Sequence, residues 1–173
     1  MNNLIGLIGN SARIIDNDPW TIVQNMADEA LQPYQILSVS DWRRVQESSH
    51  PLMDGLQLGI WLQPDEDPAE IAPWVNRLPI IALSFESFLD GRAYSQAYLL
   101  RSRYGFKGEL RAIGDVLRDQ LAAMRHCGFT AFAVRADKSV VNAMEGLKAF
   151  DLIYARSVTN PEPLFKRRPP KKV

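Results

Sequence analysis

The chain has 173 residues, 46% of them hydrophobic, and no formal net charge. This length supports one sizeable hydrophobic core but not two, so we expect a single domain over residues 1–165. No apolar run approaches the roughly 20 residues of a membrane-spanning helix, and the first residues lack the basic region of a secretory signal. We therefore expect a cytoplasmic protein without membrane contact. The single cysteine, Cys127, excludes an internal disulfide and a Cys-x-x-Cys redox pair.

The basic residues are concentrated at the end of the sequence. Five of the 20 lie within the last eight positions, and without them 15 basic residues face 20 acidic ones, a net charge of about −5. An acidic body argues against nucleic-acid binding. We predict that residues 166–173 form a basic flexible tail, either a solvated end or a contact for nucleic acid or acidic lipid.

Residues 1–55 predict a mixed α and β portion. The expected elements are a hairpin over 4–9 and 12–15, a helix over 20–31, a strand over 34–39 and a short helix over 41–47. No catalytic or ligand-binding pattern is visible in this portion.

Residues 56–155 predict strands that alternate with helices. The expected strands are 56–62, 79–85, 109–113 and 130–135, and the helices that follow them are 67–78, 92–104, 115–126 and 139–150. Four strand-helix units in succession require parallel strands joined by right-handed crossovers. We therefore predict an α/β fold, a βαβαβαβα run that forms either an open sheet or half of a (β/α)₈ barrel.

A half barrel leaves sheet edges and an inner face exposed. This arrangement predicts that the inner face is covered either by the N-terminal hairpin and helix or by a second copy of the chain, as a homodimer.

Polar residues follow the predicted strands, where parallel sheets bind ligands. Asp90, Arg92 and Ser95 follow strand 79–85, Asp115 and Arg118 follow strand 109–113, and Arg135 ends strand 130–135. Arginines beside helix N-termini suit a small anion such as sulfite, sulfate or phosphate. The alternative is that Asp90 and Asp115 only cap the helices that follow them.

Arg111 is a further candidate, because it lies in the middle of strand 109–113 on the same face as Glu109. A guanidinium in an apolar layer needs a partner. That partner is either Glu109 or Asp90 in an ion pair, or an anionic ligand.

Recognised cofactor and metal motifs are missing from the sequence. His50, His126 and Cys127 have no metal-site spacing, and the sequence has no dinucleotide-binding glycine pattern, phosphate loop or nucleophile elbow. We therefore predict no metal and no recognisable cofactor. Cys127 lies at a helix C-terminus, where the dipole disfavours a thiolate, so a small buried hydrophobe is the expected role.

The run FLDGRAYSQAYLLRSRYGFKGELRAIGDVLRDQLAAMRHCGFTAFAVRAD, with LGIWLQPDEDP before it and PLFKRR after it, resembles a known bacterial family. Its pattern is Asp-Gly-Arg-x-x-Ser followed by Gly-x-x-Gly-Glu-Leu-Arg-Ala-x-Gly-Asp-Val-x-x-Asp-Gln. This pattern is similar to that of the domain of unknown function 934 proteins. Members are commonly labelled as oxidoreductases involved in sulfite reduction, because they accompany the sulfite reductase haemoprotein in sulfate assimilation and cysteine biosynthesis.

The resemblance implies the pathway, and two hypotheses for the protein's role remain open. The first is an accessory protein that binds the sulfite reductase haemoprotein or a small anion through the Asp-Gly-Arg and Gly-Asp turns. The second is a small enzyme, an oxidoreductase or not, whose site is built from Asp90, Arg92, Arg111 and Asp115.

Overall fold

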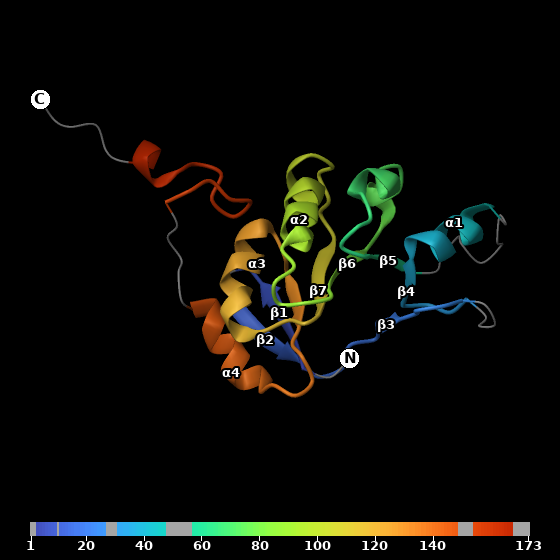
Figure 1. Cartoon of the computed structure of the whole chain (residues 1–173), viewed down its shortest axis with the longest axis horizontal. Helices are drawn as coiled ribbons and strands as arrows, with labels where there is room; N and C mark the ends of the chain where they lie inside the picture. The colour runs from blue at the N-terminus through green and yellow to red at the C-terminus, as the bar shows by residue number, and fades with distance from the viewer. Residues whose placement is uncertain (1–2, 10, 27–30, 48–56, 149–153, 168–173) are drawn as a thin grey trace, which may run out of the picture.

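A computed structural model describes residues 3–9, 11–26, 31–47, 57–148 and 154–167 (Figure 1). The predicted basic tail lies mostly outside these residues, as does His50. No helix among the described residues is long and apolar enough to cross a membrane.

The described residues form one curled, mostly parallel sheet with helices along it, which confirms the predicted α/β class. Its eight strands have the order β2-β1-β8-β7-β6-β5-β4-β3, and all neighbours are parallel except the two pairs that β1 makes. The strands are β1 (Leu4–Ile8), β2 (Ser11–Ile15), β3 (Thr21–Ile22), β4 (Gln35–Ser38), β5 (Gly59–Leu62), β6 (Ile80–Phe85), β7 (Glu109–Gly114) and β8 (Ala131–Ala133). The α-helices are α1 (Val39–Glu47), α2 (Arg92–Ser102), α3 (Leu121–Cys127) and α4 (Val140–Glu145).

Two predicted helices differ from the structure in their form. The helix expected over 67–78 is a pair of 3₁₀ turns, Pro68–Ile71 and Val75–Arg77. Pro73 lies between them, and its missing N–H and bulky ring oppose a continuous α-helix. The helix expected over 115–126 begins with the 3₁₀ turn Arg118–Gln120 and becomes α-helical only at Leu121.

The helix predicted over 20–31 is wrong for the described residues 20–26, which contain the short strand β3 instead. The backbone N–H of Thr21 donates to the carbonyl of Tyr34, and that of Val23 donates to Ile36, at 2.9 Å each. β-branched residues favour such a ladder over a helix.

The predicted hairpin is confirmed, but it extends the sheet beside β8 and does not cover the inner face. After β2 the chain crosses to β3 at the opposite edge through residues 16–20. The six peptide links from Ile15 to Thr21 span at most roughly 22 Å, whereas a flat eight-stranded sheet would be about 34 Å wide. The sheet must therefore curl strongly, and the connection passes across its inner face.

The sheet has a hydrophobic layer on each face. Its outer face packs on the helices, with Leu83 and Phe132 of the sheet against Ala97 and Met124 in one large cluster. The inner face, opposite the helices, carries a smaller cluster that is partly covered by Trp20 from the crossing connection. Its buried members are Ile36, Ile80, Ala82 and Ile113. Cover for the inner face thus comes from the same chain, and the homodimer stays a prediction.

Candidate functional site at the carboxyl ends of the strands

A tight turn at the end of β7 builds the centre of the site. Gly114 has φ +91°, and a Cβ atom there would lie 2.3 Å from the carbonyl oxygen of Phe85 at the end of β6. The next residue, Asp115, donates its backbone N–H to that same carbonyl at 2.7 Å. Only glycine combines this left-handed conformation with so close an approach. The Gly-Asp turn therefore fixes Asp115 beside the loop that follows β6.

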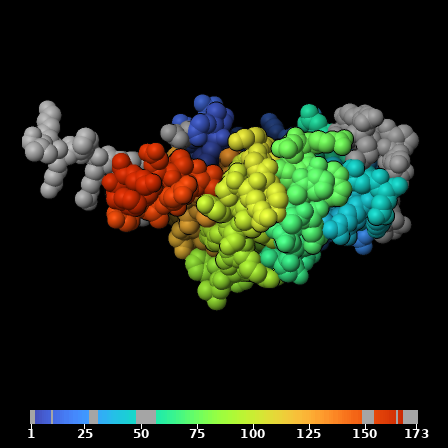
Figure 2. Space-filling view, turned by 90° about the horizontal axis from the view of Figure 1, so that it is seen from above, coloured from blue at the N-terminus to red at the C-terminus, as the bar shows by residue number. Residues whose placement is uncertain are grey.

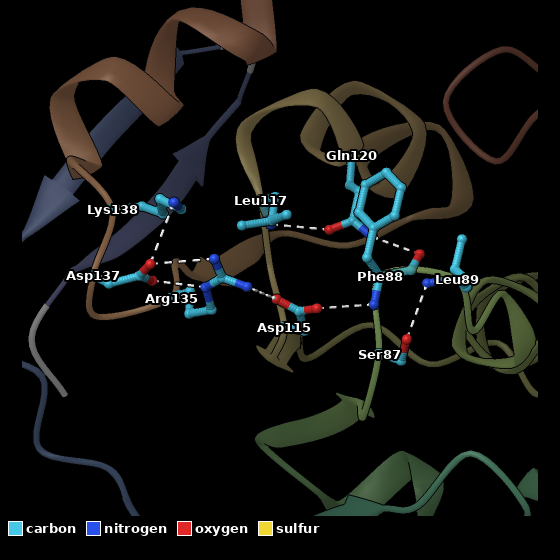
Figure 3. A network of polar contacts seen from close by, with 9 residues as sticks. All are labelled: Ser87, Phe88, Leu89, Asp115, Leu117, Gln120, Arg135, Asp137 and Lys138. Carbon is cyan, nitrogen blue, oxygen red and sulfur yellow. Dashed lines mark hydrogen bonds and ion pairs between the residues drawn. The ribbon is translucent and has the colours of Figure 1, made fainter.

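The carboxylate of Asp115 joins three segments (Figure 3). Its Oδ2 accepts a hydrogen bond from the backbone N–H of Phe88 at 2.9 Å, and its Oδ1 accepts one from Nη1 of Arg135 at 2.7 Å. The alternative that Asp115 caps the helix after it is wrong, because both oxygens face other elements. At the start of that helix the side chain of Gln120 satisfies a backbone N–H instead, because its Oε1 accepts the N–H of Leu117 at 2.9 Å.

Arg135 lies between two carboxylates. Its Nε donates to Oδ1 of Asp137 at 2.7 Å, while Lys138 lies 3.3 Å from the other oxygen of Asp137. The hydrogen bond from Arg135 lowers the pKa of Asp137 to about 2. The carboxylates of Asp137 and Asp115 in turn raise the pKa of Arg135. The two carboxylates and the two basic side chains thus form one chain of ion pairs.

The loop after β6 presents two apolar side chains to solvent although its backbone is anchored. Phe88 is 44% exposed and Leu89 is 89% exposed. Besides the bond to Asp115, the carbonyl of Phe88 accepts from Nε2 of Gln120 at 3.4 Å, and the N–H of Leu89 donates to Oγ of Ser87 at 3.3 Å. Sequence reasoning missed Phe88 and Leu89, because it considered only the charged residues of this stretch. An apolar pair inside a polar turn was the available signal.

Asp90 and Arg92 form a second, local pair at the start of α2. The backbone N–H and the Nε of Arg92 both donate to Oδ1 of Asp90 at 3.0 Å, and Nη2 donates to Oδ2 at 2.6 Å. The N-cap position itself is Gly91, so Asp90 does not cap α2 from the predicted position, although it accepts the N–H of Arg92, the first residue of the helix. The hydrogen bonds from Arg92 lower the pKa of Asp90. Ser95 lies exposed on the next part of α2.

Arg111 lies apart from these residues, buried on the inner face with only 1% of its side chain exposed. Nη1 and Nη2 donate to the two oxygens of Asp18 at 2.6 and 2.9 Å, and Nε donates to Glu109 at 2.7 Å. Burial by itself would lower the pKa of Arg111, but these two carboxylates outweigh it and raise the pKa. The predicted pairing with Glu109 is confirmed. The pairing with Asp18 was missed, because 93 residues separate the two.

Arg118 faces a separate pocket beside the start of α4. Its Nη1 donates to Oδ1 of Asn142, and with Lys138 and Ser139 it lines a pocket of about 260 Å³. The seven predicted residues thus fall into four places: Asp115 with Arg135, Asp90 with Arg92 and nearby Ser95, Arg118 alone, and Arg111 on the inner face.

The described residues contain no group of three or more His, Cys, Asp or Glu side chains placed to hold a metal ion. His126 lies near Thr159, with 3.0 Å between Nδ1 and Oγ1. Burial raises the pKa of the Cys127 thiol, which disfavours the reactive thiolate. This agrees with a packed hydrophobic side chain and not with a nucleophile.

In comparison with known proteins, residues 59–165 match a family described as "Bacterial protein of unknown function (DUF934)". All seven candidate residues lie within this stretch. No curated protein and no solved structure matches the chain significantly.

Proposed function

Because the chain belongs to the bacterial family of unknown function DUF934, we propose that it is a cytoplasmic accessory protein of assimilatory sulfite reduction and cysteine biosynthesis. In this proposal it binds the sulfite reductase haemoprotein through its carboxyl-end surface, defined here as residues 86–91 with Asp115 and Arg135. The pathway rests on the sequence resemblance, and the surface rests on the geometry of the site.

The observation that carries the proposal is the exposure of Phe88 and Leu89, at 44% and 89%, on an anchored loop. Full burial of one such side chain in a partner is worth about 1.5–3 kcal/mol. A loop already held by Asp115 and Gln120 loses little conformational entropy when it docks. Exposed apolar side chains on a fixed backbone are therefore suited to binding another protein.

The charges around the loop support a protein partner more than a free anion. Arg92 already binds Asp90, and Arg135 binds Asp115 and Asp137, so a small anion would compete with carboxylates of the chain itself. A partner protein can contact the apolar side chains and leave these pairs in place.

The alternative of a small enzyme has less support from the geometry. Its site would need Arg111 beside Asp90 and Asp115, yet Arg111 is 1% exposed and its Nε and both Nη atoms donate to Asp18 and Glu109. Asp90 pairs with Arg92, away from Arg111.

The test is a binding measurement between the purified protein and the sulfite reductase haemoprotein by biolayer interferometry. The double variant Phe88→Ser/Leu89→Ser should weaken binding by about tenfold or more, since roughly 1.4 kcal/mol corresponds to a factor of ten. The matched control is Ile8→Ser, because Ile8 is 64% exposed and lies on β1, outside the carboxyl-end surface. The control should bind as the wild type does.

Equal binding by the wild type and the double variant would contradict the proposed surface, and no binding by the wild type would contradict the proposed partner. The same variants are run in light scattering. If the wild type and the control self-associate and the double variant does not, then a second copy of the chain, and not the reductase, binds the carboxyl-end surface.

A further inference from the structure

A pocket of about 440 Å³ lies at the opposite end of the sheet, near the amino ends of β7 and β8. It is formed by the end of α2, the turn after that helix and the segment 156–161. Three cationic side chains line it, Arg101, Lys107 and Arg156, and none of its lining residues in the described part of the chain is acidic. Its volume falls within the roughly 300–1,000 Å³ of small-molecule sites.

Arg101 is the most informative of these residues, because only part of its guanidinium is satisfied. Nε donates to the carbonyl of Gly128 at 2.9 Å, and Nη1 donates to the carbonyls of Phe106 and Gly108 at 2.7 and 2.9 Å. Nη2 is buried and has no hydrogen-bond partner among the described residues. Burial lowers the pKa of Arg101 to about 10, and no carboxylate of the described residues contributes to the shift.

A purely structural role explains only part of this arrangement. Arg101 ties the end of α2 to two turns through three carbonyls, and its Cζ lies 5.1 Å from the centre of the Phe106 ring. These contacts account for Nε and Nη1. They leave Nη2 unsatisfied and a buried positive charge that no carboxylate of the described residues compensates, which is a costly state. They also do not account for Lys107 and Arg156 in the same pocket.

The segment that carries Arg156 is docked at this place by specific contacts. The backbone N–H of Val158 donates to the carbonyl of His126 at 3.0 Å, and Ser157 and Asn160 close a turn with bonds of 3.0 and 2.9 Å. Figure 2 shows residues 154–167, in red, against the yellow surface around residues 100–110. Arg156 is thus held on the wall of the pocket facing α2.

We propose that this pocket binds a small molecule through a divalent oxyanion, a phosphate or a sulfur oxyanion. In this proposal the guanidinium of Arg101 forms the base of the site, with Nη2 as its unused donor, and Lys107 and Arg156 supply further charge. Charge-assisted hydrogen bonds of this kind are stronger than those between neutral groups. The planar guanidinium of arginine also matches the spacing of the oxygens in such anions. Tyr98, 44% exposed, and Phe106 form apolar walls that leave room for an attached organic group. The inference is independent of the proposed reductase contact, which uses the other end of the sheet.

The test is an NMR titration of the ¹⁵N-labelled protein with sodium phosphate, sodium sulfate and sodium sulfite, at ionic strength held constant with sodium chloride. We expect a saturable shift of the Arg101 Nε–H signal with at least one of the three anions. The anion that binds tightest distinguishes a phosphate site from a sulfur-oxyanion site. A role for Arg101 in folding alone would not make this signal move on titration.

Variants of exposed residues then locate the site without disturbing the fold. Lys107 and Arg156 both lie at exposed positions. Lys107→Gln and Arg156→Gln should each weaken binding of the oxyanion about three- to tenfold. Arg103→Gln is the matched control, because Arg103 is exposed near the same helix end, lies 5.7 Å from the Tyr104 ring and does not line the pocket. Shifts that do not saturate, or equal weakening by the control, would overturn the proposal.

Discussion

The strongest prediction for stability concerns the buried pair of Asp18 and Arg111, which are 3% and 1% exposed. Two unit charges about 4 Å apart attract by about 4 kcal/mol at an effective dielectric constant of about 20, and breaking a buried pair costs about 3–5 kcal/mol. Asp18→Asn leaves Glu109 at 2.7 Å from Arg111 and keeps one acceptor oxygen. We therefore expect a loss near the lower limit, about 3 kcal/mol of unfolding free energy.

Urea unfolding followed by tryptophan fluorescence measures this loss, and Trp20, two residues from Asp18, packs on the same inner-face cluster. The matched control is Asp16→Asn at an exposed position of the same connection, which should change stability by less than about 0.5 kcal/mol. A similarly small change for Asp18→Asn would refute the reasoning. The double variant Asp18→Leu/Arg111→Met should recover much of the loss, because it removes both fully buried charges and leaves only Glu109, which is 32% exposed to solvent, without its partner.

Three other predictions follow from single residues. Gly114→Ala should cost about 2 kcal/mol or more in urea unfolding, because φ is +91° and the new Cβ would lie 2.3 Å from the Phe85 carbonyl oxygen; a cost under about 0.5 kcal/mol would contradict this. Burial raises the pKa of Glu66 above its ordinary 4.5, so the wild type should lose stability as pH rises through 4.5 to the raised pKa. Glu66→Gln should therefore be the more stable protein above this range and not below it, and the opposite pH dependence in urea unfolding would contradict the assignment. Burial also raises the pKa of Cys127, so iodoacetamide should alkylate the folded protein more slowly at pH 8 than the urea-unfolded one, and equal rates would contradict the packing.

The repeating part of the fold could be predicted from sequence because its signals are local. The strand predicted over 79–85 is Ile80–Phe85, and the one over 109–113 is Glu109–Gly114. Each is an apolar run followed by a helical pattern. The strand β3 could not be predicted in the same way, because its hydrogen bonds go to Tyr34 and Ile36. A two-residue strand leaves almost no periodicity to detect.

The candidate site was predictable to the extent that it depends on parallel neighbours. Asp115 and Arg135 follow adjacent strands β7 and β8, and the structure places them 2.7 Å apart. The partner of Arg111 was not predictable, because Asp18 reaches it only when the connection after the hairpin crosses the curled sheet. The three carbonyl partners of Arg101 were not predictable either, because they come from two turns whose positions no local pattern reveals.

The contact between Asp18 and Arg111 also bears on which residues form the folding unit. Arg111 belongs to the stretch that matches the family, residues 59–165, whereas Asp18 lies before it. Without the earlier residues, Arg111 would keep Glu109 but lose both of its bonds to Asp18, and the inner-face cluster would lose Ile36 and Trp20. The sheet would also end at β8 and β5, two strands otherwise paired on both sides. The matched stretch alone would thus leave a buried charge short of partners, and β5 and β8 would each have one unpaired edge. The described residues before Gly59 therefore contribute to the same core.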